Sequence, residues 1–146
     1  MVLVGTIAGI LEALWTRLRG DATLTAILGK PARLYHVWAP PDSPMPYWTY
    51  AMTDAPDLEA AGLSSGELLL ELWDHDPDSL TAVRAEAAGD RVTKLLDGHE
   101  FSSSGGEVKA VRVAQLSKGF LETDSDRVHR WVSRWTLRYV RQGEMQ

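Results

Sequence analysis

The chain has 146 residues, a formal net charge of −5 and no cysteine, and 45% of its residues are hydrophobic against 24% charged. This usage excludes wholesale disorder, and the length predicts one domain over residues 1–146, with a flexible end at about 142–146. The missing cysteines exclude disulfides and thiolate chemistry, and the acidic balance argues against a protein that mainly coats nucleic acid.

The first segment predicts a helix that ends at Gly20, with Thr6 as a possible cap. Its apolar residues recur at helical spacing, at Ile7, Ile10, Leu11, Leu14 and Leu18. Charged residues interrupt this apolar run and no basic leader precedes it, so we expect no signal peptide, no membrane span and a cytoplasmic origin. A shorter helix over 21–28 follows, capped by Asp21 and ended by Gly29.

Two strands are predicted next, over 33–38 and 47–53, from their aromatic and β-branched content. Four prolines between positions 39 and 46 cannot lie inside a sheet, so this segment is predicted to be a surface loop. A long connection over 54–66 follows, and loops of that length are often functional.

The central unit is a strand and a helix over 67–98. Leu68, Leu70 and Leu72 alternate with polar residues, which predicts a half-buried strand. The helix is predicted from about 80 to 96, with Asp78 or Ser79 as its cap and Gly98 beyond its end. The apolar residues predicted to face the core are Leu80, Val83, Ala87, Val92 and Leu95.

A strand over 107–115, a polar turn over 118–126 and a last strand over about 127–141 complete the chain. At ~3.3 Å per residue the last strand would reach about 45 Å, so it is predicted to bend or to project past its own domain. Its aromatic side, with Trp131 and Trp135, is the predicted core face. Its other side carries Arg130, Arg134 and Arg138 and is predicted to meet solvent or a partner.

This order of elements predicts an α+β fold. We expect a mixed or antiparallel sheet of about five strands, with the N-terminal helix and the central helix packed on one face.

No motif predicts catalysis, a metal site or a cofactor. The pattern G-x-S-x-G over 62–66 lacks the strand-turn-helix setting of a nucleophile elbow. Asp74 and Asp76 flank His75, and a metal site with His99 or His129 is one interpretation, but capping of the helix is favoured. The last strand places its tryptophans and arginines on opposite faces, which favours a protein interface over stacking on bases.

Taken together, these segments resemble the tail-completion or tail-terminator proteins of long-tailed, siphovirus-type bacteriophages. The similarity covers nearly the whole chain and depends on the order of short motifs. These are the opening helix before Asp21-Ala22-Thr23-Leu24, Arg33-Leu34-Tyr35 before the proline loop, Pro46-Tyr47-Trp48-Thr49-Tyr50, Leu72-Trp73-Asp74 before the helix that closes at Leu95-Leu96-Asp97-Gly98, and Phe120-Leu121-Glu122-Thr123-Asp124 before the last strand.

The resemblance implies a virion protein without catalytic activity. Such proteins form a homohexameric ring on the head-proximal end of the tail tube, stop its polymerisation and present a surface to the neck or head-completion protein. DNA would pass through the ring without sequence-specific binding. The implied localisation is the virion, with assembly in the host cytoplasm and no membrane contact.

Two groups of contact residues are expected from that resemblance. The subunit interface is predicted on the last strand, with Arg130, Arg134 and Arg138 against the acidic residues Glu67 and Glu71 of a neighbour. Docking on the tail tube is predicted for the loop over 54–66, at Asp57, Leu58, Glu59 and Leu63.

Other interpretations remain open at this stage. Another ring of the phage neck, a connector or a stopper, would share a small α+β subunit. A ligand-binding or enzymatic domain would need a pocket with converging titratable groups. A nucleic-acid binder would use the arginine face. The absence of asparagine suggests a thermophilic source as a further hypothesis.

Overall fold

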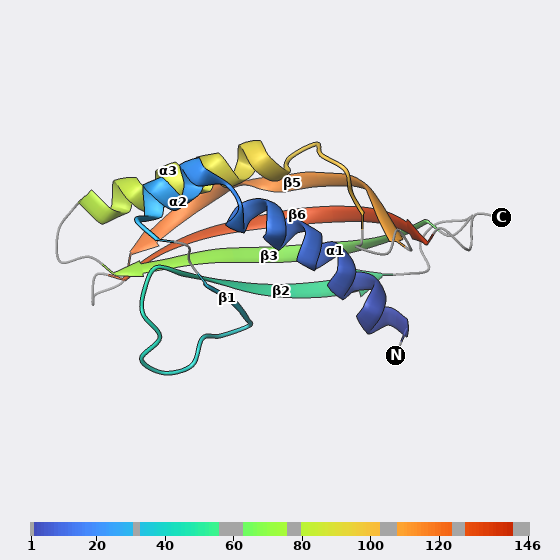
Figure 1. Cartoon of the computed structure of the whole chain (residues 1–146), viewed down its shortest axis with the longest axis horizontal. Coiled ribbons are helices and arrows are strands. Elements are labelled where there is room, and N and C mark those ends of the chain that lie inside the picture. The colour runs from blue at the N-terminus through green and yellow to red at the C-terminus, as the bar shows by residue number, and fades with distance from the viewer. Residues whose placement is uncertain are drawn as a thin grey trace.

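In the described part of the chain, six strands form one sheet in the order β1-β2-β3-β6-β5-β4, and three helices lie on one of its faces (Figure 1). The computed structural model describes residues 2–30, 33–55, 63–75, 80–102, 108–123 and 128–141. The helices are α1 (Val2–Arg19), α2 (Ala22–Leu28) and α3 (Leu80–Leu96). The strands are β1 (Arg33–His36), β2 (Tyr47–Ala55), β3 (Leu63–His75), β4 (Phe101–Ser102), β5 (Val108–Thr123) and β6 (Val128–Arg141).

The predicted α+β class is confirmed: α2 lies where the shorter helix was predicted, and β4 is a sixth strand that was not predicted. β1 runs parallel to β2 and every other neighbouring pair is antiparallel, so the sheet is mixed. The central helix is found where the periodicity placed it. β3 begins earlier than predicted, at Leu63, which shortens the expected long connection.

β6 lies in the middle of the sheet, so of the two predicted alternatives, that it bends or that it projects past its own domain, the second is wrong. It pairs with β3 from Val128↔His75 to Val140↔Leu63 and with β5 along its other side. β6 therefore has a neighbouring strand on both sides, although register shifts interrupt its pairing with β5, and it forms no edge of the sheet. Its length is matched by β5, whose residues 118–123 continue as strand where a turn was predicted.

The core lies between the helices and the sheet. As predicted, Leu68, Leu70 and Leu72 of β3 and Trp131 and Trp135 of β6 are buried on this face. In α3 the prediction was partly wrong: Val92 and Leu95 are buried, but Val83 is 65% exposed. The buried positions of α3 also include Ala85, Ala88 and Leu96.

Trp131 explains why α3 faces the sheet through small residues. A Cβ added to Gly89 of α3 would lie 2.2 Å from Cε2 of the Trp131 indole, and one added to Gly119 of β5 would lie 2.2 Å from its Cζ2. The indole therefore packs between two glycines, in a space that any larger side chain would occupy. Its ring also meets Trp48 edge to face, with centroids 6.4 Å apart.

The helix ends follow the sequence in three places. The Asp21 carboxylate accepts a hydrogen bond of 2.8 Å from the Leu24 amide, and Gly29 and Gly98 have φ of 81° and 77°. The predicted cap Thr6 lies inside α1, which begins at Val2. The predicted caps of α3, Asp78 and Ser79, lie outside the described residues.

Candidate functional site

The face of the sheet opposite the helices is the candidate functional surface, and we call it the open face (Figure 1). No described helix lies over it. Alternate residues of β3 and β6 point to it, among them Glu67, Leu69 and Glu71 and, on β6, Arg130 and Arg134. In one half of the open face the polar and charged side chains form hydrogen bonds and ion pairs with one another, and in the other half Glu67 and Arg134 form none among the described residues.

One half is closed by a row of side chains that crosses four strands. Tyr47, Trp73, Arg130 and Glu122 are successive register partners. The Tyr47 and Trp73 rings stack with centroids 6.5 Å apart, and the Arg130 guanidinium lies 5.3 Å from the Trp73 ring centroid. Such a cation over an indole is favourable, especially where water is partly excluded.

Ion pairs complete this row. Arg130 Nη1 lies 2.9 Å from a Glu71 carboxylate oxygen, and Arg130 also donates to Glu122. The hydrogen bond to Glu122 is the largest influence that raises the pKa of Arg130, so the guanidinium stays charged. Trp73 Nε1 donates to Thr49 Oγ1 at 2.9 Å. Beneath the row Thr49 and Val132 are buried, although neither lies under a helix.

The other half has no such cover. A hollow of about 310 Å³ lies there, lined by Ala51, Glu67, Leu68, Leu69 and Arg134. We call it the open-face hollow. Glu67 and Arg134 are exposed, and within the described residues neither side chain has a hydrogen bond or an ion pair. This half therefore combines an apolar floor with two charges that have no partner among the described residues.

The five predicted interface residues come together on one surface. Arg130, Arg134, Arg138, Glu67 and Glu71 belong to β3 and β6, which are neighbours in the sheet. Arg130 and Glu71 form an ion pair within the chain at 2.9 Å, and their contact across two subunits stays a prediction. Of the predicted tube-docking residues, Asp57, Leu58 and Glu59 lie outside the described residues, and Leu63 is described only by its backbone, which begins β3.

Sequence reasoning missed a protruding apolar pair after β1. Val37 is 55% and Trp38 80% exposed, and Val37 has φ of 67°, which is strained for a β-branched residue. The Val37 amide donates to the Tyr50 carbonyl at 2.8 Å, which holds the backbone there. The residues over 33–38 are of types typical of a strand, and prolines follow them, so nothing in the sequence indicated the positive φ of Val37.

Asp74 proves to be a buried ion-pair residue. Its side chain is 1% exposed, and Arg84 of α3 donates to it through Nε at 2.9 Å and Nη2 at 2.8 Å. Burial raises the pKa of Asp74, and Arg84 opposes that rise. His129 is its register partner on β6. No group of three metal-binding side chains occurs among the described residues, and Asp76 lies outside them.

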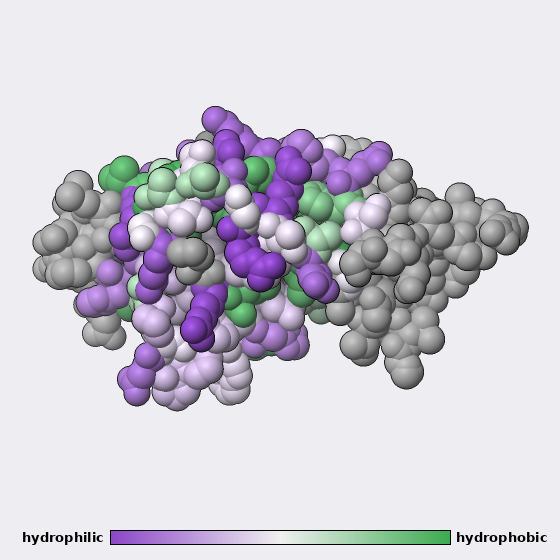
Figure 2. Space-filling view, viewed as in Figure 1, coloured by the Kyte–Doolittle hydropathy of each residue, from purple (hydrophilic) through white to green (hydrophobic). Residues whose placement is uncertain are grey.

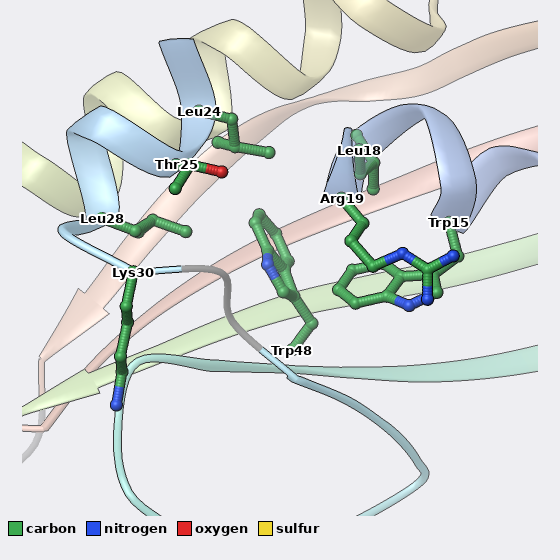
Figure 3. A pocket seen from close by; sticks show the side chains of 8 residues that line it. All are labelled: Trp15, Leu18, Arg19, Leu24, Thr25, Leu28, Lys30 and Trp48. Carbon is green, nitrogen blue, oxygen red and sulfur yellow. The ribbon is translucent and has the colours of Figure 1, made fainter. Parts of the chain in front are cut away.

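The interior offers little room for a small molecule at the gap shown in Figure 3. This space, between α1, α2 and β2, measures about 10 Å³, and Trp48 points from β2 toward Leu24 and Leu28 of α2. It would hold one water at most. The G-x-S-x-G segment also lacks an elbow, because residues 63–66 run straight through β3 in register with β6. Among the described helices, none is long and apolar enough to cross a membrane.

Comparison with solved structures identifies the fold. One chain of a structure titled "Virion of native gene transfer agent (GTA) particle" matches with a TM-score of 0.69 and 21% identity, over 91% of this chain and 96% of that one. A second solved chain matches with a TM-score of 0.57 and 18% identity, over 94% and 96%. At these identities the likeness shows a shared fold. Neither a family model nor a curated protein matches the sequence.

Proposed function

We propose that this protein is a structural component of a phage-like virion. It forms a homohexameric ring on the head-proximal end of the tail tube, stops tube growth and presents the surface to which the neck attaches. It catalyses no reaction and needs no cofactor, and the DNA passes through its ring without sequence-specific contacts. Residues 1–146 act as a single domain.

The observation that carries this proposal is the likeness to the chain from a gene transfer agent virion, which extends over 96% of that chain. The two chains therefore share the whole of a small domain rather than a common motif. The open face supports an assembly role, because its uncovered half is a surface that a second protein can bury. The resemblance of the sequence to tail terminators selects the tail end among the positions in a particle.

Two measurements test the proposal. Gold labelling of this protein on purified particles, viewed by electron microscopy, is expected to mark the junction of tail and neck. Label on the head shell or the tail tip would contradict it, and label on the head side of the junction would favour a neck connector or stopper. Native mass spectrometry of the purified protein is expected to give a species of about 97 kDa, six copies of 16.2 kDa.

A deletion tests the proposed docking on the tube. Removal of residues 58–62, which precede β3, is expected to leave the protein folded but unable to stop tube growth, so that tubes of irregular length accumulate. Truncation after residue 141 is the control, because it removes five residues far from this segment in sequence. Tubes of normal length with the deleted protein would contradict docking through this segment.

A further inference from the structure

The outward side of α3 carries an acidic stripe. Ala85, Ala88 and Val92 face the sheet, so residues half a turn away point outward. The exposed residues on that side, here called the α3 stripe, are Val83, Glu86, Asp90, Lys94 and Asp97. Figure 2 views the helix-covered face, where hydrophilic residues are interspersed with small hydrophobic areas.

The α3 stripe lacks partners within the described chain, apart from Asp97, which accepts a hydrogen bond from the Gln115 amide. The Glu86 and Asp90 side chains have no hydrogen bond or ion pair among the described residues. Val83 is 65% exposed and stands about one helical turn, ~5 Å, before Glu86. An apolar side chain thus protrudes next to unpaired acids.

The open-face hollow has the opposite pattern. Its floor is apolar, from Ala51 and Leu69, and Arg134 is the register partner of Leu69. Arg134, which has no partner among the described residues, therefore lies beside the apolar floor of the hollow. On α3, in the same way, the acid Glu86 lies beside the protruding apolar side chain of Val83. Glu67 also lines the hollow, and its charge is opposite to that of Lys94 in the α3 stripe.

We propose that the α3 stripe of one copy docks in the open-face hollow of the next copy. Val83 packs against Leu69, and Glu86 and Asp90 face Arg134. The two surfaces lie on opposite sides of one sheet, so each copy offers both, and the contact runs head to tail and closes into a ring. The inference rests on the proposed function and adds to it the surfaces that join the subunits.

Disulfide trapping tests the contact directly, because the chain has no cysteine of its own. In the double variant Glu86→Cys/Arg134→Cys the two thiols lie on opposite faces of the sheet and cannot bond within one copy. Mild oxidation of the purified protein and of assembled tails is expected to give a ladder of oligomers that ends at a closed ring. The matched control is Glu12→Cys/Arg134→Cys, since Glu12 is an exposed acid of α1 on the same side as α3. A ladder in the control and none in the test variant would overturn the inference.

Charge reversal gives a second, independent test. Arg134→Glu and Glu86→Arg each place like charges at every contact, so each variant alone is expected to lose at least tenfold in assembly. An equimolar mixture is expected to assemble again with strict alternation, because every contact then joins opposite charges. A mixture of Arg134→Glu with Glu12→Arg is the control. Glu12→Arg keeps both surfaces of the contact and is expected to assemble alone, while Arg134→Glu stays out of its rings, so no ring with alternating copies forms.

The outcomes separate this inference from the proposed function. If the wild-type ring caps tubes while both charge variants assemble as well as the wild type, the α3 stripe is not the interface and the proposed function stands. If the wild type forms no ring on tubes and labelled particles show it elsewhere, the proposed function fails. Trapped contacts between the stripe and the hollow would then still establish the interface.

Discussion

Arg84 clamps the carboxylate of Asp74 from one side, with Nε and Nη2 each within 2.9 Å of a different oxygen. The pair joins α3 to β3, and its two members differ in exposure: the Asp74 side chain is 1% exposed and that of Arg84 35%. Removing Arg84 leaves the buried Asp74 carboxylate without its partner. Removing Asp74 leaves the Arg84 guanidinium, which is partly exposed and can be hydrated.

Arg84→Met is therefore expected to lower the free energy of unfolding by about 3 kcal/mol at pH 7. Urea unfolding measures it. Replacing both members, in Asp74→Leu/Arg84→Met, is expected to recover most of that loss, because no buried charge remains. A double variant as unstable as the single one would show that packing, and not charge, sets the cost.

The same pair predicts a pH dependence. Burial raises the pKa of Asp74 above its ordinary value, so the folded state binds a proton more readily than the unfolded state, and the charged form costs stability as pH rises through the raised pKa. Without Arg84 this pKa rises further. The deficit of Arg84→Met is expected to be present at pH 7 and to disappear as pH falls through the raised pKa of Asp74, because the carboxyl is then neutral in the folded state with or without Arg84. A deficit independent of pH would contradict this.

Asp21 is expected to titrate with the opposite sign. Arg91 donates to it through Nε at 2.9 Å and Nη2 at 2.7 Å, and this hydrogen bonding is the largest influence that lowers the pKa of Asp21. Its contribution is present above the ordinary value of 3.8 and is lost as pH falls through the lowered pKa. Asp21→Asn keeps the cap but not the charge, so it is expected to cost about 1 kcal/mol at pH 7 and little at pH 2. Thermal unfolding of the wild type and of Asp21→Asn at both pH values measures this difference in stability.

Gly89→Ala is expected to destabilise the protein by about 3 kcal/mol or more, because the new methyl group would overlap the Trp131 indole. Combining it with Trp131→Leu makes room for that methyl group. The double variant is then expected to be more stable than the sum of the two single losses predicts. Strict additivity would mean that the two side chains do not compete for one space.

Val37→Gly is expected to raise stability by roughly 0.5–1 kcal/mol, because glycine accepts φ of 67° without strain and Val37 buries little surface. Asp42, with φ of 63°, is the matched control. Aspartate tolerates this region better than a β-branched residue, so Asp42→Gly is expected to be nearly neutral. Equal changes in stability at both positions would contradict the interpretation that the backbone is strained at Val37.

The sequence predicted the elements whose signals are local. Leu68, Leu70 and Leu72 alternate, Asp21 and Gly29 bracket α2, and each of these predictions is confirmed. It did not predict the pairing of β6, because strand order depends on contacts between residues far apart in the chain. The outward turn of Val83 was missed for the same reason: Trp131, distant in sequence, requires small residues on the inner side of α3.

The candidate surface was predicted only in part. Charge on alternate residues marked Arg134 and Glu67 as outward-facing. That Arg130 is already occupied by Glu71 and Glu122 follows from the register of three strands, which no single segment specifies. The place of Trp73 between the Tyr47 ring and the Arg130 guanidinium depends on the same register.

Because β6 lies between β3 and β5, the sheet can be completed only after the last strand has been synthesised. β1, β2 and β3 emerge from the ribosome before β4 and β5, and these two halves have no shared strand until β6 has been translated. Until then the strands on the two sides of β6 cannot be joined into one sheet. Only the completed polypeptide can close them into one, so a prematurely terminated copy would lack the finished surface and could not be built into a particle.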